Sequence, residues 1–251
     1  MTAGKIYIIG IGPGSPDHMT PAARKAISRC DVIIGFSLYV DLVKEEFPGK
    51  CYETSGMQNE LARARRAIDL AEQGMTAGLI SSGDAGIYGI AGPALEMMQK
   101  IGSNADVEIV PGISALSSVA SLLGSPLTND FAVISMSDLL TPIDIILKRI
   151  EIFAMSDIVT VIYNPRGSRF PDNIKRAIEI FMKHRDPDTA TGIVKNAYRE
   201  GQTVKISRLS QISFEDIDML TTIVIGNSET FVYRGMMSTR RGYSRKYRID
   251  S

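Results

Sequence analysis

Three short apolar segments in the first half of the chain each run directly into a glycine-containing loop. The segments and their loops are residues 5–9 with 10–14, residues 77–80 with 81–89, and residues 107–110 with 111–115. A helical pattern follows each loop, and the order strand, helix, strand predicts a parallel sheet covered by helices. Glycine lets the main chain approach a ligand closely, and ligands of such sheets bind at the carboxyl ends of the strands. The feature therefore predicts an α/β fold with a ligand site at these loops.

The pattern of elements changes after residues 124–128, Gly-Ser-Pro-Leu-Thr, which form the best linker in the chain. Beyond this linker, residues 190–194 and 203–207 flank a short turn and predict an antiparallel hairpin. The second half thus mixes helices with antiparallel strands. We predict an N-terminal α/β domain over residues 1–123 and a C-terminal mixed α/β domain over residues 128–251.

Composition and charge argue against several classes of protein. The 28 Lys and Arg residues balance 28 Asp and Glu residues, so the zero net charge does not favour nucleic-acid binding. Cys30 and Cys51 are the two cysteines, and their spacing predicts no zinc site, disulfide framework or iron–sulfur cluster. We find no signal peptide and no apolar run of about 18 residues, so we expect a cytoplasmic protein without a membrane span.

The first glycine loop, residues 10–14, invites comparison with a dinucleotide-binding fingerprint. That fingerprint needs Gly-x-Gly-x-x-Gly directly before a helix, but Ser15 stands at the sixth position and the helix starts only after Thr20. The acid that binds ribose should follow the second strand, whereas Asp31 precedes it. A nicotinamide-dependent oxidoreductase is therefore the weaker alternative.

The middle loop, residues 81–89, leaves two interpretations open. Ser82, Gly83 and Asp84 could hold a ligand, or the loop could be a tight connector in which Asp84 caps the next helix. Small or polar residues also follow other strands of both domains, and this pattern suggests a ligand cleft between the domains. The hydroxyls and the acid within residues 135–138 could likewise contact a substrate or serve the entry to a helix.

Together, these segments resemble the tetrapyrrole methylases over nearly the whole chain. The glycine-loop motifs are residues 7–14, 81–89 and 110–115, and further matching segments are residues 55–57, 131–142, 161–166, 192–197, 219–228 and 241–243. The further segments narrow the resemblance to those members that act on a precorrin at ring carbon 17.

The resemblance implies a fold of two α/β domains, the N-terminal sheet mostly parallel and the C-terminal sheet mixed, with the cofactor cleft between them. It implies transfer of a methyl group from S-adenosyl-L-methionine, with S-adenosyl-L-homocysteine as product, to precorrin-3B or cobalt-precorrin-3. That reaction includes contraction of the ring and belongs to cobalamin biosynthesis. Methylation of another corrin position or another tetrapyrrole is the alternative. A homodimer without nucleic-acid, membrane or metal partners is also expected.

Site residues follow from the same resemblance, position by position. The predicted cofactor contacts are Gly12, Pro13, Ser82, Gly83, Asp84, Ile87, Tyr88, Ser114, Ala115, Tyr163, Asn164, Asn196, Ala197, Thr221 and Thr222. Many members of the family carry methionine or leucine where Asn164 stands and proline where Ala85 stands.

Groups for the chemistry are predicted in both domains. Asp84 is expected to orient the cofactor or substrate rather than act as a base, while Ser135 and Asp138 are candidates for managing protons during ring contraction. Arg166 and Arg241 are predicted to bind the carboxylates of the substrate, because arginine can pair with a carboxylate through two parallel hydrogen bonds.

Overall fold

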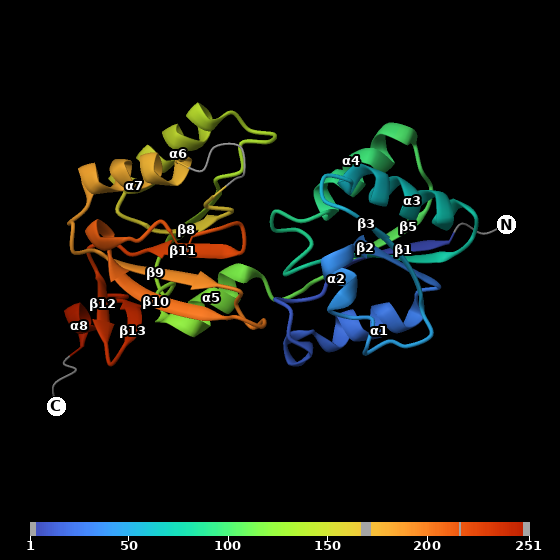
Figure 1. Ribbon diagram of the computed structural model, residues 1–251, viewed down its shortest axis with the longest axis horizontal. Coiled ribbons are helices and arrows are strands. Elements are labelled where there is room, and N and C mark those ends of the chain that lie inside the picture. The colour runs from blue at the N-terminus through green and yellow to red at the C-terminus, as the bar shows by residue number, and fades with distance from the viewer. Residues whose placement is uncertain (1–3, 167–171, 216, 248–251) are drawn as a thin grey trace. The chain divides into compact units, whose positions relative to one another are not determined.

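The chain forms two compact units, Met1–Ala115 and Leu116–Ser251. A computed structural model describes residues 4–166, 172–215 and 217–247 (Figure 1). Residues 1–3 of the first predicted domain and residues 167–171, 216 and 248–251 of the second lie outside the described part. No helix in these described ranges is long and apolar enough to cross a membrane.

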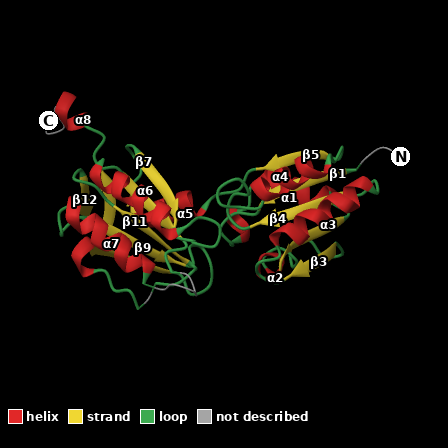
Figure 2. Cartoon of the chain, turned by 90° about the horizontal axis from the view of Figure 1, so that it is seen from above, coloured by secondary structure: helices red, strands yellow, loops and turns green. Residues whose placement is uncertain are grey.

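The first unit is built on a five-stranded, entirely parallel sheet with the order β3-β2-β4-β1-β5. Its strands are β1 (Lys5–Gly10), β2 (Val32–Phe36), β3 (Cys51–Ser55), β4 (Thr76–Ser81) and β5 (Asp106–Val110). Its helices are the short 3-10 turn η1 (Pro16–His18), α1 (Pro21–Arg29), α2 (Ser37–Asp41), α3 (Glu60–Glu72) and α4 (Ala91–Ile101). Figure 2 shows β3, β4, β1 and β5 side by side, which confirms the predicted parallel α/β architecture.

Alternating side chains of these strands fill two cores, one on each face of the sheet. Ile6 and Ile8 of β1 join the core under α3 and α4, whereas Tyr7 and Ile9 join the core under α1 and α2. Figure 1 shows the two helix pairs on opposite faces. Successive strand residues point to opposite faces, so a strand that is covered on both sides must be apolar throughout.

The start of α1 follows the predicted local chemistry. The Thr20 hydroxyl accepts a hydrogen bond from the Ala23 amide (3.1 Å), and Pro21 occupies the first helical position. Helix α6 begins differently: its N-cap is Pro142, and no side chain caps it.

The second unit contains a mixed five-stranded sheet with the order β10-β9-β11-β8-β7. Its strands are β7 (Phe131–Ser135), β8 (Val159–Tyr163), β9 (Ala190–Lys195), β10 (Thr203–Arg208) and β11 (Thr221–Ile225). The helices of this unit are α5 (Ala115–Leu123), α6 (Ile143–Met155), α7 (Asn173–His184), the 3-10 turn η2 (Leu209–Gln211) and α8 (Tyr243–Lys246). Strands β9 and β10 form the predicted antiparallel hairpin, and the mixed sheet confirms the expected architecture of the second half.

Helix α5 packs with the second unit. Its residues Val119 and Leu123 share a core with Val159 and Val161 of β8 and with Val224 of β11. The units therefore meet at Ala115 and Leu116, before α5, whereas the linker composition predicts a boundary after it. The residues of the predicted linker instead include β6 (Gly124–Ser125), which pairs with β13 (Met236–Thr239).

The sequence patterns did not indicate every strand. Strand β3 and strand β12 (Thr230–Tyr233) each lie at the edge of a sheet and are partly exposed, and each is short, with four or five residues. An edge strand is covered on fewer sides than a central strand, so it needs no continuous apolar run.

A buried arginine connects several segments of the second unit. Arg185 is only 8% exposed, and its guanidinium donates hydrogen bonds to the carbonyl oxygens of Phe153 (3.0 Å), Ile158 (2.6 Å) and Gly226. It also lies over the ring of Phe181. Burial lowers the pKa of Arg185 to about 10. One buried side chain thus donates hydrogen bonds to carbonyl groups of three different segments.

We expect Arg185→Met to lower the free energy of unfolding of the second unit by about 3 kcal/mol or more, because several buried carbonyls lose their donor. Urea unfolding followed by circular dichroism measures the change. Arg208→Met is the matched control, since Arg208 is 58% exposed and pairs with Asp188 at the surface; it should change stability by less than about 0.5 kcal/mol. Equal effects of the two substitutions would contradict the structural role of Arg185.

Candidate functional site

The loops after β1 and β4 are joined by their main chains. The Gly12 amide donates to the Gly83 carbonyl oxygen (3.0 Å), and the Gly83 amide donates to the Gly12 carbonyl oxygen (2.7 Å). This pair forms an isolated antiparallel bridge beyond the ends of two parallel strands. Two loops whose paired glycines are 71 residues apart in sequence are therefore joined into one surface.

Glycine is required at this junction for two physical reasons. Gly12 and Gly83 have φ values of +80° and +66°, which side chains disfavour. A Cβ atom on Gly112, in the loop after β5, would lie 2.1 Å from the Gly83 carbonyl oxygen, and one on Gly10 would lie 2.7 Å from that same oxygen. Three loops thus meet through bare main chain, and a side chain at these positions would push them apart.

The Asp84 carboxylate ties the second and third loops together. Its Oδ1 accepts a hydrogen bond from the Gly86 amide (2.8 Å), and its Oδ2 accepts one from the Gly112 amide (3.0 Å). Asp84 is half-buried. Bonds between a charged carboxylate and main-chain amides are among the stronger hydrogen bonds in proteins. Both oxygens of Asp84 therefore hold the geometry of the site.

The junction lies where the connections of the sheet change direction. Strands β1 and β4 are neighbours, but β1 leads to α1 on one face while β4 leads to α4 on the other. Ligands of open α/β sheets bind at such a switch point, outside the carboxyl ends of the strands. The topology thus places a ligand site where the glycine loops meet.

The structure brings the predicted residues of the first unit together at these loops. Gly12 and Pro13 follow β1, and the main chain of Ser114 and Ala115 lies beside Gly83. Ser114 is buried, whereas Ile87 and Tyr88 are exposed. The remaining predicted residues of this unit, Ser82, Gly83 and Asp84, form the loop itself.

The predicted residues of the second unit form a separate group at one edge of its sheet, here the edge where strands β7, β8 and β9 end and β11 begins. Strands β7, β8 and β9 run in one direction, because β7 is parallel to β8 while β8 and β9 are both antiparallel to β11. The register pairs Ser135 with Tyr163 and Thr221 with Lys195. Asn164, Asn196, Ala197 and Thr222 adjoin these positions, so the seven predicted residues reach one edge.

Hydrogen bonds organise this edge. The Ser135 hydroxyl accepts from the Asn164 side-chain amide (3.0 Å) and from the Ser137 main-chain amide (3.2 Å). The Tyr163 hydroxyl accepts from the Leu116 amide (2.7 Å) and so caps the start of α5. Asn164 has a φ value of +50°, a strained conformation for a residue with a side chain.

An ion pair lies at the same edge. Lys195 Nζ lies 2.7 Å from Asp218 Oδ2, and the Thr221 hydroxyl donates to Asp218 Oδ1 (3.0 Å). Burial opposes the charge of Asp218, but hydrogen bonds from Lys195, Leu220 and Thr221 outweigh it and hold the pKa of this carboxyl below its usual value. The Thr221 hydroxyl is therefore engaged within the turn before β11.

The predicted charged residues of the second unit do not all gather at this edge. The amide of Arg240, which precedes Arg241, donates a hydrogen bond to the Glu229 carbonyl oxygen (3.1 Å). Two residues before Glu229, the Asn227 side chain donates to the carbonyl oxygen of Asp157 (2.9 Å), which precedes β8. Asn164 follows the other end of β8. Arg241 therefore lies toward the opposite edge of the sheet.

The other two predicted charged residues contact protein groups near the candidate edge. The Arg166 guanidinium donates weakly to the carbonyl oxygens of Phe214 (3.4 Å) and Ile217 (3.3 Å). The Asp138 carboxylate accepts a long hydrogen bond from Asn173 at the start of α7 (3.5 Å). Both side chains are thus oriented by the protein itself.

Sequence reasoning missed two features of the first unit. Gly10 and Gly112 are as necessary for the loop junction as Gly12, and the motifs Gly-Ile-Gly and Pro-Gly could have indicated them. Arg63 is buried and binds the loop after β3 through Ser55 and Gly56, a long-range contact that no local pattern reveals.

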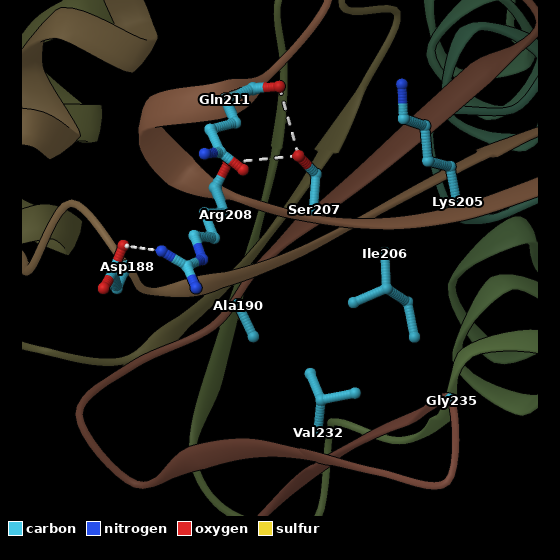
Figure 3. A pocket seen from close by; sticks show the side chains of 9 residues that line it. All are labelled: Asp188, Ala190, Lys205, Ile206, Ser207, Arg208, Gln211, Val232 and Gly235. Atoms are coloured by element: carbon cyan, nitrogen blue, oxygen red, sulfur yellow. Dashed lines mark hydrogen bonds and ion pairs between the residues drawn. The ribbon is translucent and has the colours of Figure 1, made fainter.

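A separate hollow in the second unit has a volume of about 680 Å³ (Figure 3). It lies between β10 and the β12–β13 hairpin, with Ile206 and Val232 on its walls and the Arg208–Asp188 ion pair at one side. None of the predicted site residues lines it. The candidate site is therefore defined by the strand-end loops and not by this hollow.

Comparison with known proteins places the chain among methyltransferases. The family of tetrapyrrole (corrin/porphyrin) methylases matches residues 5–213. A cobalt-factor III methyltransferase of Priestia megaterium is 45% identical over 98% of this chain and 46% of its own length. A probable cobalt-factor III C(17)-methyltransferase of Salmonella typhimurium is 40% identical over 95% of this chain and 99% of its own length.

Among solved structures, the crystal structure of the methyltransferase CobJ superposes with a TM-score of 0.90. It is 28% identical and covers 95% of this chain and 100% of its own. This likeness extends over both units and confirms the fold expected from the sequence. The chain spans about half the length of the Priestia relative, so it corresponds to one part of that protein and to the whole of shorter relatives.

We expect Gly112→Ala to destabilise the first unit by about 2 kcal/mol or more, because its Cβ atom would overlap the Gly83 carbonyl oxygen. Gly92→Ala is the matched control. Gly92 lies in α4 with no atom within 4 Å of the added methyl group, so alanine should stabilise the helix by about 0.5–1 kcal/mol. Urea midpoints measure both changes, and a stable Gly112→Ala variant would show that the loops do not depend on close main-chain contact.

Proposed function

Because the chain belongs to the tetrapyrrole (corrin/porphyrin) methylases, we propose that it methylates ring carbon 17 of a corrin precursor with S-adenosyl-L-methionine. The substrate is precorrin-3B or its cobalt-containing counterpart, and the reaction contracts the ring during cobalamin biosynthesis. The names of the Priestia and Salmonella relatives and the likeness to CobJ support this assignment. Methylation of another corrin position or another tetrapyrrole is the second candidate.

The loop junction is the observation that carries the proposal. Gly10, Gly12, Gly83 and Gly112 let the loops form a surface of main chain at the switch point of the sheet. A Cβ atom on Gly10 or Gly112 would overlap the main chain of another loop, and Gly12 and Gly83 have left-handed backbone. Such a surface fits a cofactor that is bound through main-chain groups and small side chains. We propose that the loops after β1, β4 and β5 hold S-adenosyl-L-methionine there.

The predicted contacts divide into main-chain and side-chain roles. The amides and carbonyl oxygens of Gly12 and Gly83 bond to each other, so these glycines are proposed to offer close approach to the cofactor, together with the main chain of Ala115, while Ser82 and Ser114 add hydroxyls. Pro13, Ile87 and Tyr88 are proposed to border the cofactor. The residues at the edge of the second sheet, Tyr163, Asn164, Asn196, Ala197, Thr221 and Thr222, remain predicted contacts.

Methyl transfer from this cofactor depends on the alignment of the methyl group with the acceptor carbon more than on a strong nucleophile of the protein. When bound, the cofactor supplies a methyl group on a positively charged sulfur, and that charge is dispersed as the group moves to carbon. The protein must therefore hold donor and acceptor in line and exclude water. A junction that is held by paired main-chain bonds suits this task, because it does not rearrange during the transfer.

Asp84 is proposed to act as a positioning residue. Its two oxygens accept hydrogen bonds from Gly86 and Gly112, so the carboxylate holds the loops that carry the cofactor. A general base would need an oxygen that faces the proton it removes. We therefore assign Asp84 to the orientation of the cofactor.

Proton transfer during ring contraction is proposed for the second unit. The Ser135 hydroxyl accepts two hydrogen bonds, from Asn164 and Ser137, and this leaves its own proton as the group that it can donate. Asp138 is proposed to assist, while Arg166 is proposed to bind a substrate carboxylate. Arg241, the other predicted anchor, lies toward the opposite edge of the sheet and is given no role at this site. A homodimer is proposed from the resemblance to the family.

A labelled-methyl assay tests the function. We expect the protein to transfer isotopically labelled methyl from S-adenosyl-L-methionine to cobalt-factor III or precorrin-3B, with the label at carbon 17 by NMR. Calorimetry should detect binding of S-adenosyl-L-homocysteine and none of NAD. Methylation at another carbon would favour the second candidate, and binding of NAD alone would overturn the methyltransferase assignment.

We expect Asp84→Asn to weaken binding of S-adenosyl-L-homocysteine about tenfold, because one side-chain oxygen is replaced by an NH₂ group that cannot accept from a main-chain amide. Titration calorimetry measures the dissociation constant. Asp69→Asn is the control, since Asp69 pairs with Arg65 on the surface of α3, and it should leave the affinity unchanged. Full turnover and unchanged affinity in Asp84→Asn would refute the positioning role.

A further inference from the structure

Large apolar side chains are exposed next to the proposed cofactor loops. Leu38, Met57 and Tyr88 are 41%, 66% and 56% exposed. They follow β2, β3 and β4, three neighbouring strands, at their carboxyl ends. The register pairs Phe36 with Ser55, so Leu38 and Met57 each lie two residues beyond a paired position. Three apolar side chains are thus presented along the same edge as the glycine loops.

One of these three residues, and the chain neighbour of another, have a strained backbone. Tyr88 and Gln58, the neighbour of Met57, have φ values of +52° and +63°. They are the only non-glycine residues with left-handed backbone in the part of the first unit that the structure describes. Residues with side chains hold this conformation only where their surroundings impose it, and such positions often occur at ligand sites.

A buried arginine fixes the loop that carries Met57. Arg63 of α3 is 7% exposed, and its Nη1 donates to the Ser55 hydroxyl (2.9 Å) and the Gly56 carbonyl oxygen (2.8 Å). Its Nη2 pairs with Glu60 (3.3 Å). A charged side chain seldom lies in the protein interior unless it is fully bonded. Arg63 therefore fixes the main chain directly before Met57.

The proposed reaction requires the substrate to bind beside the cofactor loops, where Leu38, Met57 and Tyr88 are exposed. The methyl carbon and the acceptor carbon must come within about 3–3.5 Å of each other, so the substrate must lie against the loops that hold the cofactor. A tetrapyrrole has two flat apolar faces and carboxylates on its periphery. Exposed apolar side chains beside the cofactor loops match such a face, since their contact with it removes apolar surface from water.

We propose that Leu38, Met57 and Tyr88 form an apolar platform that supports one face of the tetrapyrrole macrocycle, with Arg63 as the positioning residue of Met57. This inference rests on the proposed function. It adds which residues of the first unit contact the substrate. Tyr88 belongs to both sites, because it ends the loop that is proposed to bind the cofactor.

Neutral polar substitutions test the platform without changing its charge. Met57→Gln and Leu38→Gln should each raise the KM for cobalt-factor III about tenfold, while the dissociation constant of S-adenosyl-L-homocysteine stays unchanged. Met57→Leu should behave as the wild type because it keeps the apolar contact. Ile101→Gln is the matched control: Ile101 is 40% exposed but ends α4, which returns to the amino edge of the sheet, so its KM should not change.

Arg63 is tested through its partners. Ser55→Ala removes one hydrogen-bond acceptor, and Arg63→Lys removes the forked geometry while keeping the charge. Both should raise the KM for cobalt-factor III about three- to tenfold with little change in kcat. If Arg63 had a purely structural role, both substitutions would lower the thermal midpoint and the cofactor affinity, and KM would not rise separately from a change in kcat.

The outcomes separate the platform from the function. If the wild type methylates cobalt-factor III but Met57→Gln and Leu38→Gln keep its KM, the platform is refuted and the proposed function stands. If the wild type binds neither S-adenosyl-L-homocysteine nor the tetrapyrrole, both proposals fail. If Met57→Gln instead converts a dimer to a monomer by light scattering, the surface is a subunit interface and the platform is refuted.

Discussion

The main-chain contact between Gly12, Gly83 and Gly112 is the constraint on which the candidate site depends. Three loops meet there without side chains between them, and each loop follows a different strand of the parallel sheet. The contact is possible because the strands end at the same level, and this level is set by their register. The sheet therefore positions the loops, and the glycines allow them to join into one surface.

Charged side chains then stabilise the loops through hydrogen bonds. Asp84 binds amides of two loops, and Arg63 holds the loop after β3 from below. Arg185 does comparable work in the second unit by binding carbonyls from three segments. In each case one ionic group binds several polar groups at once, among them main-chain groups of loops or of the ends of helices and strands. The exposed apolar platform can be rigid because its support is buried.

Much of the fold could be predicted from local patterns. The parallel sheet, the Thr20 cap of α1 and the β9–β10 hairpin follow from apolar runs, capping chemistry and turn composition, which act over a few residues. Strands β3 and β12 were not predicted in this way, because both are short, partly exposed edge strands, and β3 also lacks a continuous apolar run. Helix α5 carries no local sign of which core it joins. Its membership of the second unit depends on the valines of β8 and β11, far along the chain.

The sequence by itself determined the family, the central strands of both large sheets, and the loops that form the candidate site, because glycine positions and apolar runs impose these locally. Only the tertiary structure decided what the site residues do. It engaged both oxygens of Asp84 with main-chain amides, brought Ser135 and Asn164 together, and put Arg241 toward the other edge of its sheet. These outcomes depend on strand register and on partners tens of residues away, which a linear pattern does not encode.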